Sequence, residues 1–280
     1  MNEARIYKHS TFSAILIAIF FAFVSVVLCT TIGMEAPFVA LPVAALMLVV
    51  LGTVFVSRLS KVVLSEDEIT TQGLFGAKTL RWTEISRVSG RGNGIKLHNF
   101  DEDVTVAPDQ QLPRYEEIIE TIGKKRPDLF SPLDHSEMKR GLGSYSGVLI
   151  SALFLVGVAA AFFFGGDLSS DAPVAFIVIA GIILIFLWMF LASPQSLTLD
   201  GRTLQLKYLL NEKTLSAEEI ASVQFVYTRT RNGKQYYIAL NLAGGGTIRI
   251  SGLGVSLPVT YLVLKNWHRA NAQGSSANLH

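Results

Sequence analysis

The residues best suited to bind a ligand are five cations in the last third of the chain. Alternating apolar residues around them predict that they point outward from strands or lie at a hairpin tip. Cationic side chains at such positions can hold an acidic partner or anionic lipid headgroups, or they can simply keep a solvated surface soluble, and both interpretations remain open. The five are Lys207, Arg229, Arg231, Lys234 and Arg249, flanked by Tyr227, Tyr236 and Tyr237.

The sequence contains no pattern typical of a catalytic, cofactor-binding or metal site. It has no P-loop, no H-E-x-x-H and no G-x-S-x-G motif, and its five histidines lack metal-ligand spacing. The single cysteine, Cys29, excludes an internal disulfide. The Gly244-Gly245-Gly246 run joins two predicted strands and does not open a helix, so we interpret it as a turn. We therefore expect a protein that is not an enzyme and needs no cofactor or metal.

The distribution of charge argues against a nucleic-acid-binding protein. The net charge of the chain is only +2. Charged residues make up 16% of the chain, against about a quarter in an average soluble domain, and the deficit lies in four apolar runs. Residues 193–280 hold 9 Lys and Arg against 4 Asp and Glu, a net charge of +5. This segment therefore carries the excess of positive charge.

The four apolar runs are residues 11–31, 37–57, 146–165 and 172–192, and none contains an ionisable side chain or a histidine. An apolar helix of about 20 residues spans a hydrocarbon layer of roughly 30 Å. The runs therefore predict two transmembrane helical hairpins, residues 11–57 and 146–192, and hence four spans. Intramembrane ionisable groups usually mark a transport path, so their absence argues against a channel or transporter.

Each apolar hairpin is followed by a polar segment that predicts short strands and then an amphipathic helix. The first domain covers residues 58–131 with a helix over 112–123, and the second covers 193–270 with a helix over 257–270. Asn-Gly and Asp-Gly pairs predict hairpin turns, and Ser216 followed by Glu219 predicts a capping box. We interpret residues 1–10 as a polar lead, 132–145 as a linker and 271–280 as a disordered tail.

The two polar domains are related by an internal repeat. Six positions from Leu64 to Val88 recur 135 residues later, from Leu199 to Val223, with the same or a similar residue. The spacing stays constant until the second domain acquires a longer central hairpin. A run of matches at one offset indicates duplication of the whole unit, apolar hairpin followed by sheet domain.

The strand meander and its closing helix resemble the bacterial pleckstrin-homology-like family. The residues that carry the resemblance are the Gly73-Leu74-Phe75-Gly76 turn, the Arg81-Trp82-Thr83-Glu84-Ile85 bend and the helix over 112–123. The second copy has Ala217 in place of the tryptophan. The resemblance implies a fold of membrane α and β type, in which each membrane hairpin precedes a small antiparallel sheet domain capped by a C-terminal helix. It also implies a role in binding rather than chemistry.

The positions of Lys and Arg predict the orientation. Arg5, Lys8, Arg58, Lys139 and Arg140 flank the apolar runs on one side, whereas the two short turns between runs have neither residue type. By the positive-inside rule, both termini and both sheet domains are expected in the cytoplasm, on a multi-pass protein of the bacterial inner membrane.

The function expected from these features is docking or oligomerisation at the membrane surface. The expected partners are the membrane itself, another protein or a second copy, and anionic lipid, but no nucleic acid. The alternative is a small transport or membrane-remodelling component that forms a pathway only on oligomerisation. The sequence does not identify the partner, the oligomeric state or a lipid preference.

Overall fold

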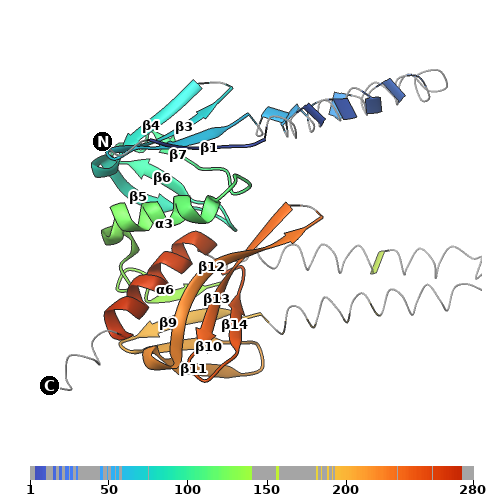
Figure 1. The fold of residues 1–280 in the computed structure, drawn as a ribbon. Helices are drawn as coiled ribbons and strands as arrows, with labels where there is room; N and C mark the ends of the chain where they lie inside the picture. Colours follow the sequence, from blue (N-terminus) through green and yellow to red (C-terminus); the bar gives the residue numbers. More distant parts are fainter. Residues whose placement is uncertain are drawn as a thin grey trace, which may run out of the picture. The chain divides into compact units, whose positions relative to one another are not determined.

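A computed structural model describes residues 4–10, 59–140 and 193–272, apart from positions 75, 232 and 254, together with isolated positions between 15 and 56 and between 156 and 191. These residues form two compact units (Figure 1). The first unit comprises Met1–Val88 and Gly94–Lys125, and the second comprises Ser89–Asn93 and Arg126–His280.

The first unit is built on a four-stranded antiparallel sheet in the order β1-β2-β3-β4. A three-stranded sheet in the order β5-β6-β7 follows, and helix α3 closes the unit. The strands are β1 (Arg5–Lys8), β2 (Lys61–Leu64), β3 (Glu68–Gly73), β4 (Gly76–Arg81), β5 (Ile85–Ser89), β6 (Lys96–Asn99) and β7 (Thr105–Val106), with the 3₁₀ turn η1 (Trp82–Glu84) between β4 and β5 and α3 over Tyr115–Lys125.

The second unit repeats this order of elements. Its four-stranded sheet has the order β11-β10-β9-β8, and its three-stranded sheet has the order β12-β13-β14. The elements are β8 (Glu137–Lys139), β9 (Ser196–Asp200), β10 (Thr203–Lys207), β11 (Glu212–Ser216), η3 (Ala217–Glu219), β12 (Ile220–Thr230), β13 (Gly233–Leu242), β14 (Thr247–Ile250) and α6 (Leu257–Ala272), preceded by η2 (Pro127–Phe130).

The strand register supports the duplication predicted from the sequence. Leu64 pairs with Ile69 in the first unit, and Leu199 pairs with Leu204 in the second, at the same offset along the chain. All four side chains are buried, because alternate residues of each strand face the core of their unit. The same alternation therefore builds both cores, and of these four residues the repeat had already matched Leu64 with Leu199.

Helix α3 buries one face, as its apolar spacing predicts. Tyr115, Ile118, Ile119 and Ile122 are fully buried, at positions i, i+3, i+4 and i+7. The helix begins at Tyr115, three residues after the predicted start, because Arg114 has a φ of 56°, which a right-handed helix does not permit. Its last turn is basic, and Pro127 follows closely, as expected for a helix end.

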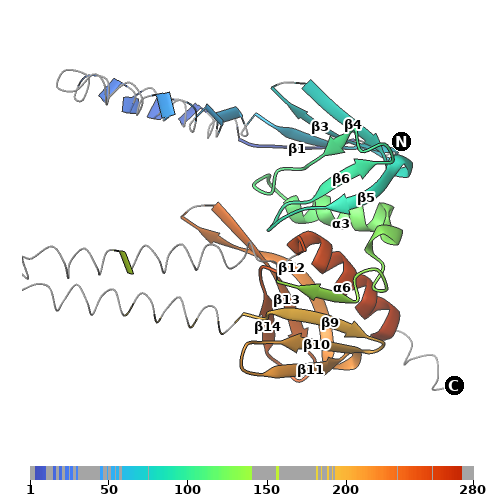
Figure 2. The same ribbon diagram turned by 180° about the vertical axis from the view of Figure 1, so that it is seen from behind.

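Helix α6 lies against β12 and β13 in both views of the ribbon (Figures 1 and 2). The indole Nε1 of Trp267 donates a hydrogen bond of 2.8 Å to the carbonyl of Gly201, and the His268 ring donates one of 2.6 Å to the carbonyl of Ile220. Two adjacent residues in the C-terminal part of the helix therefore hold it to the β9–β10 turn and to the start of β12.

The lead and the linker each contain a strand that the sequence analysis did not identify. Strand β1 pairs antiparallel with β2, and β8 pairs antiparallel with β9. Tyr7 and Met138 occupy equivalent places, opposite Val62 and Leu197, and both are buried. Strands of three or four residues are too short to show a clear alternation, and their partners lie more than 50 residues away in sequence, so no local pattern reveals them.

The expected fold of two transmembrane hairpins is contradicted. Within the described residues the architecture is predominantly antiparallel sheet with the α-helices α3 and α6, and no helix there is long and apolar enough to cross a membrane. The longer of the two, α6, has 16 residues and carries Lys265 and Arg269. Residues 11–57 and 146–192, to which the four spans were assigned, lie mostly outside the described residues.

The same finding contradicts three further expectations that depended on the spans. They are the membrane as an integral partner, the multi-pass location in the bacterial inner membrane, and the description of the chain as a transmembrane protein. The physical reason is length: a helix needs about 20 apolar residues to cross the bilayer, and neither α3 nor α6 reaches that.

Candidate functional site

The β12–β13 hairpin carries most of the predicted basic residues near its tip. Antiparallel pairing sets Arg229 opposite Lys234 and Tyr227 opposite Tyr236. The ammonium group of Lys234 lies 4.6 Å from the ring centroid of Tyr227 and 5.8 Å from that of Tyr236, and it donates a 3.3 Å hydrogen bond to the Tyr236 hydroxyl. The two rings therefore fix one cation at the base of the exposed hairpin tip.

A row of aromatic rings connects this cation to helix α6. Tyr227 lies 5.5 Å from Tyr236, Tyr236 stacks on Phe225 at 4.9 Å, and Phe225 stacks on Tyr261 of α6 at 5.3 Å between ring centroids. At the far end, Lys265 donates a 3.1 Å hydrogen bond to the Tyr261 hydroxyl. The exposed fraction of the side chain is 39% at Tyr227 and 2% at Tyr261. The row of rings therefore extends from the core of the unit to its surface.

The structure brings three of the five predicted residues together and separates the other two. Arg229, Arg231 and Lys234 lie at or beside the hairpin tip. Arg249 lies on the opposite face of the sheet, since it pairs with Ala239 and its guanidinium lies 5.0 Å from the ring centroid of Tyr237. Lys207 lies in the other sheet, paired with Glu212.

Acidic side chains do not balance the charge of this hairpin. No Asp or Glu occurs between Ile220 and His280, a segment that holds six Lys and Arg residues. Arg229 and Arg231 are exposed, and no ion pair among the described residues involves either of them. The tip therefore presents an uncompensated positive potential to the solvent. Hereafter the tip cluster means Tyr227, Arg229, Arg231 and Lys234.

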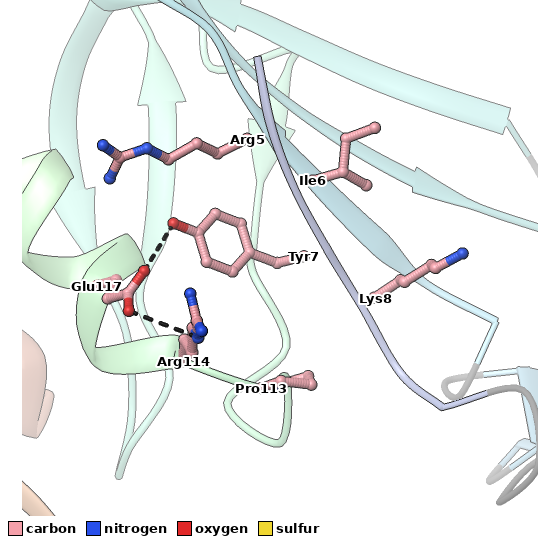
Figure 3. A pocket seen from close by; sticks show the side chains of 7 residues that line it. All are labelled: Arg5, Ile6, Tyr7, Lys8, Pro113, Arg114 and Glu117. Carbon is pink, nitrogen blue, oxygen red and sulfur yellow. Dashed lines mark hydrogen bonds and ion pairs between the residues drawn. The ribbon is translucent and has the colours of Figure 1, made fainter. Parts of the chain in front are cut away.

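A second basic site lies in the first unit, beside strand β1. An open pocket of about 700 Å³ is bordered by four consecutive residues of β1 and by the start of α3 (Figure 3). In the figure, the side chains of Arg5 and Tyr7 point toward α3, whereas those of Ile6 and Lys8 point to the other face of the strand. The lining residues are Arg5, Ile6, Tyr7, Lys8, Pro113, Arg114 and Glu117, and hereafter they are the β1 pocket.

Glu117 organises the helix side of the β1 pocket. Tyr7 donates a 3.2 Å hydrogen bond to its Oε2, and the Arg114 guanidinium lies 3.7 Å from its Oε1. Burial, followed by the hydrogen bond to Glu117, raises the pKa of Tyr7 above its ordinary value. Tyr7 therefore stays protonated and donates this bond at neutral pH.

The second unit has no counterpart of this charge pattern. At the places equivalent to Arg114 and Glu117, helix α6 carries Val259 and Leu262, which are buried. On β8, the edge strand equivalent to β1, Lys139 and Glu137 form an ion pair of 2.9 Å and neutralise one another. The two units therefore have equivalent edge strands, but of the two only β1 carries a net positive charge, from Arg5 and Lys8.

Sequence reasoning did not identify the β1 pocket, although it noted two of its residues. Arg5 and Lys8 were used only to predict the orientation of the apolar runs. Nothing in the sequence connects them with Arg114 or Glu117, which lie more than 100 positions later. The repeat contained the only usable signal. Tyr7 and Met138 are equivalent residues, and each lies a few positions before an apolar run. This shared position would have indicated a strand in both places.

The arrangement of side chains at the two sites suits the binding of anions. In the part of the chain that the structure describes, no group of three His, Cys, Asp or Glu residues could hold a metal ion. The His9 ring lies 3.0 Å from Asp109, in a buried position that ties the end of β1 to the loop before α3. Both sites contain exposed guanidinium groups, which bind carboxylates through charge-assisted hydrogen bonds.

No protein-family model matches this chain, and no curated protein sequence matches it.

Proposed function

We propose that this protein is a docking protein without enzymatic activity, and that its tip cluster binds an acidic segment of a partner protein. The observation that carries the proposal is the position of Lys234 against Tyr227 and Tyr236, next to two exposed arginines and far from any acidic side chain in sequence. The hairpin supplies both charge and a partly exposed aromatic ring, a combination enriched at protein interfaces.

The charge of the tip cluster determines the class of partner. Arg229 and Arg231 offer planar guanidinium groups that bind carboxylates in a bidentate manner. The exposed face of Tyr227 adds apolar contact area at low cost in conformational entropy, because tyrosine has few rotatable bonds. A partner segment with several carboxylates around one apolar or aromatic residue would satisfy both features.

Self-association through the hairpin is disfavoured by the same charges. Two tip clusters brought together by a two-fold axis would place arginine beside arginine, and like charges across an interface cost several kcal/mol. An acidic partner has no such penalty. We therefore assign the hairpin to docking and not to oligomerisation.

The order of elements supports a further part of the proposal, that both units belong to the bacterial pleckstrin-homology-like family. Each has a four-stranded sheet, a three-stranded sheet and a closing helix, in that order. In that family the domain serves binding, which agrees with docking as the function.

The docking proposal is tested by titrating the full-length protein with a defined acidic peptide. The probe is an acetylated, amidated peptide with the sequence Asp-Glu-Trp-Glu-Asp, and binding is followed by fluorescence anisotropy of an attached label. The double variant Arg229→Glu, Arg231→Glu should weaken binding by about tenfold or more, since each charge-assisted hydrogen bond contributes on the order of 1.5–3 kcal/mol. Raising the salt concentration should weaken binding to the unmodified protein as well.

Lys207→Glu is the matched control for this test. It reverses one predicted site residue of the same unit, but that residue lies in the other sheet opposite Glu212. Binding should therefore remain within about twofold of the unmodified protein, because exposed charges at a distance are screened. Equal weakening by Lys207→Glu and by the double variant would show a non-specific charge effect and overturn the proposal.

A further inference from the structure

Strand β1 ends its sheet, and the side of the strand away from β2 borders an open pocket. In the order β1-β2-β3-β4, β1 pairs with β2 alone, in a register that sets Arg5 opposite Leu64 and Lys8 opposite Lys61. In an antiparallel edge strand, alternate residues direct their backbone N–H and C=O groups away from the neighbouring strand. An edge of this kind is a template for one more strand.

The β1 pocket carries more positive than negative charge. Arg5, Lys8 and Arg114 contribute three cations and Glu117 contributes one carboxylate, so the lining has a net charge of +2. Glu117 accepts from Tyr7 and lies near Arg114, and no ion pair among the described residues involves Arg5 or Lys8. The Arg5 side chain interacts with the Tyr7 hydroxyl group. Among the described residues, neither cation on this edge therefore has a carboxylate as its ion-pair partner.

Strand β1 also presents one apolar side chain, that of Ile6, to the solvent. Ile6 is 61% exposed, and it lies opposite Val63 of β2. A single exposed isoleucine is ordinary on a protein surface, but its side chain offers apolar contact area to a strand laid beside β1. A strand laid along β1 would place a side chain directly opposite Ile6, about 4.5–5.5 Å away between Cβ atoms.

We propose that β1 binds an extended acidic peptide segment by strand addition. The segment lies antiparallel to β1 and carries carboxylates opposite Arg5 and Lys8, which are three positions apart, and an apolar residue opposite Ile6. Arg114, on the helix side of the pocket, adds a third positive charge on the face shared with Arg5 and Tyr7. Main-chain hydrogen bonds supply affinity, and the charges select acidic segments.

Strand addition by a second copy of this chain is disfavoured at this edge. Antiparallel pairing of β1 with β1 of another molecule would bring Arg5 and Lys8 into opposition, and like charges directly opposite one another destabilise a sheet. The neutral edge β8 lacks this charge selection, because Glu137 and Lys139 pair within the strand. The proposal therefore concerns the first unit alone and does not depend on the tip cluster of the second.

The test uses the full-length protein and three synthetic octapeptides, all acetylated, amidated and labelled for fluorescence anisotropy. The acidic probe has the core Glu-Thr-Val-Glu between Ser-Thr and Thr-Ser, with valine placed to meet Ile6. The second peptide replaces both glutamates by lysine. The third has the core Glu-Pro-Val-Glu, which keeps the charge but removes one backbone donor and is therefore poorly tolerated in a paired strand. We expect the acidic probe to bind, and the other two to bind at least about tenfold more weakly.

Two variants probe the protein side of the interaction. Arg5→Glu should weaken binding of the acidic probe by about tenfold, by reversing a charge on the edge. Arg114→Asn removes a charge at a position whose φ is 56°, and asparagine tolerates that backbone conformation, so the variant should fold and bind several-fold more weakly. Lys96→Glu, at an exposed position of β6 in the same unit, is the matched control and should leave binding within about twofold.

Three outcomes would overturn the proposal. If the proline-containing peptide bound as tightly as the acidic probe, the interaction would rest on charge alone and would not be strand addition. If Lys96→Glu weakened binding as much as Arg5→Glu, the edge would have no special role. If Arg229→Glu, Arg231→Glu abolished binding of the acidic probe while Arg5→Glu did not, the peptide would occupy the tip cluster instead.

Discussion

The hydroxyl group of Tyr7 donates a 3.2 Å hydrogen bond to Oε2 of Glu117, a residue 110 positions later in the chain. The bond joins the edge strand β1 to the first turn of α3. Tyr7 is 6% exposed, so its ring belongs to the core while its hydroxyl group reaches the pocket. One side chain therefore holds the short strand in place and shapes the β1 pocket.

Replacing Tyr7 by phenylalanine should destabilise the first unit modestly. The variant keeps the ring in the core and removes only the hydrogen bond, so the loss of unfolding free energy should be about 1 kcal/mol. Chemical denaturation followed by circular dichroism measures the change. Glu117→Gln is the companion variant, and it should cost less because the amide oxygen still accepts the bond. A phenylalanine variant as stable as the unmodified protein would show that the bond is not formed in solution.

The stability of the first unit should fall in alkaline solution. Burial, followed by the hydrogen bond to Glu117, raises the pKa of Tyr7 above its ordinary value of 10.0. Above that pH the folded protein retains a proton that the unfolded chain has lost, so the unfolding free energy decreases as the pH rises. The loss continues until the pH exceeds the pKa of the folded state.

The Tyr7→Phe variant should show a shallower decline over the same alkaline range. The decline should not vanish, since burial also raises the pKa of Tyr115 in the same unit. Denaturation midpoints between about pH 9 and 11 test this, because the titration of an ordinary tyrosine is centred near 10. Identical slopes for the variant and the unmodified protein would contradict the role given to Tyr7.

Removing the cap of η3 should destabilise the second unit. Ser216 accepts a hydrogen bond from the backbone N–H of Glu219, and the Glu219 carboxylate accepts one of 2.7 Å from the backbone N–H of Ser216. Ser216→Ala should therefore cost about 1 kcal/mol, whereas Ser216→Asp, which restores an acceptor, should cost less. Thermal unfolding measures the difference. Equal stability of the alanine and aspartate variants would contradict the cap.

Truncating equivalent core residues should destabilise the protein by similar amounts. Ile69 and Leu204 hold the same place in the two repeats, and each is fully buried. Ile69→Ala and Leu204→Ala should each cost about 2–5 kcal/mol, because a cavity replaces a well-packed side chain. Thr70→Ala, at a half-buried position next to Ile69, is the control and should change stability by less than about 1 kcal/mol. A cost below that of the control at either core position would show that the site is not packed as described.

Much of the secondary structure was predictable from local pattern. The alternation of Leu204 and Leu206 with polar residues predicted strand β10, and the spacing of Tyr115, Ile118 and Ile122 predicted helix α3. The capping box at Ser216 was also confirmed. These features depend on contacts between residues that are near in sequence, so periodicity and capping chemistry are sufficient to find them.

The sequence by itself determined the duplication, the strands with clear alternation, the two closing helices and the basic character of the β12–β13 hairpin. Only the tertiary structure decided that β1 and β8 complete their sheets and that Lys207 and Arg249 lie apart from the tip cluster. It also decided that Arg5 and Arg114 line the same pocket. The expected transmembrane fold is contradicted for the described residues, because no helix there is long and apolar enough to cross a membrane. The physical reason is distance along the chain. A periodic sequence pattern reflects contacts between residues that are near in sequence, whereas a binding site is formed by side chains far apart in sequence that folding brings together.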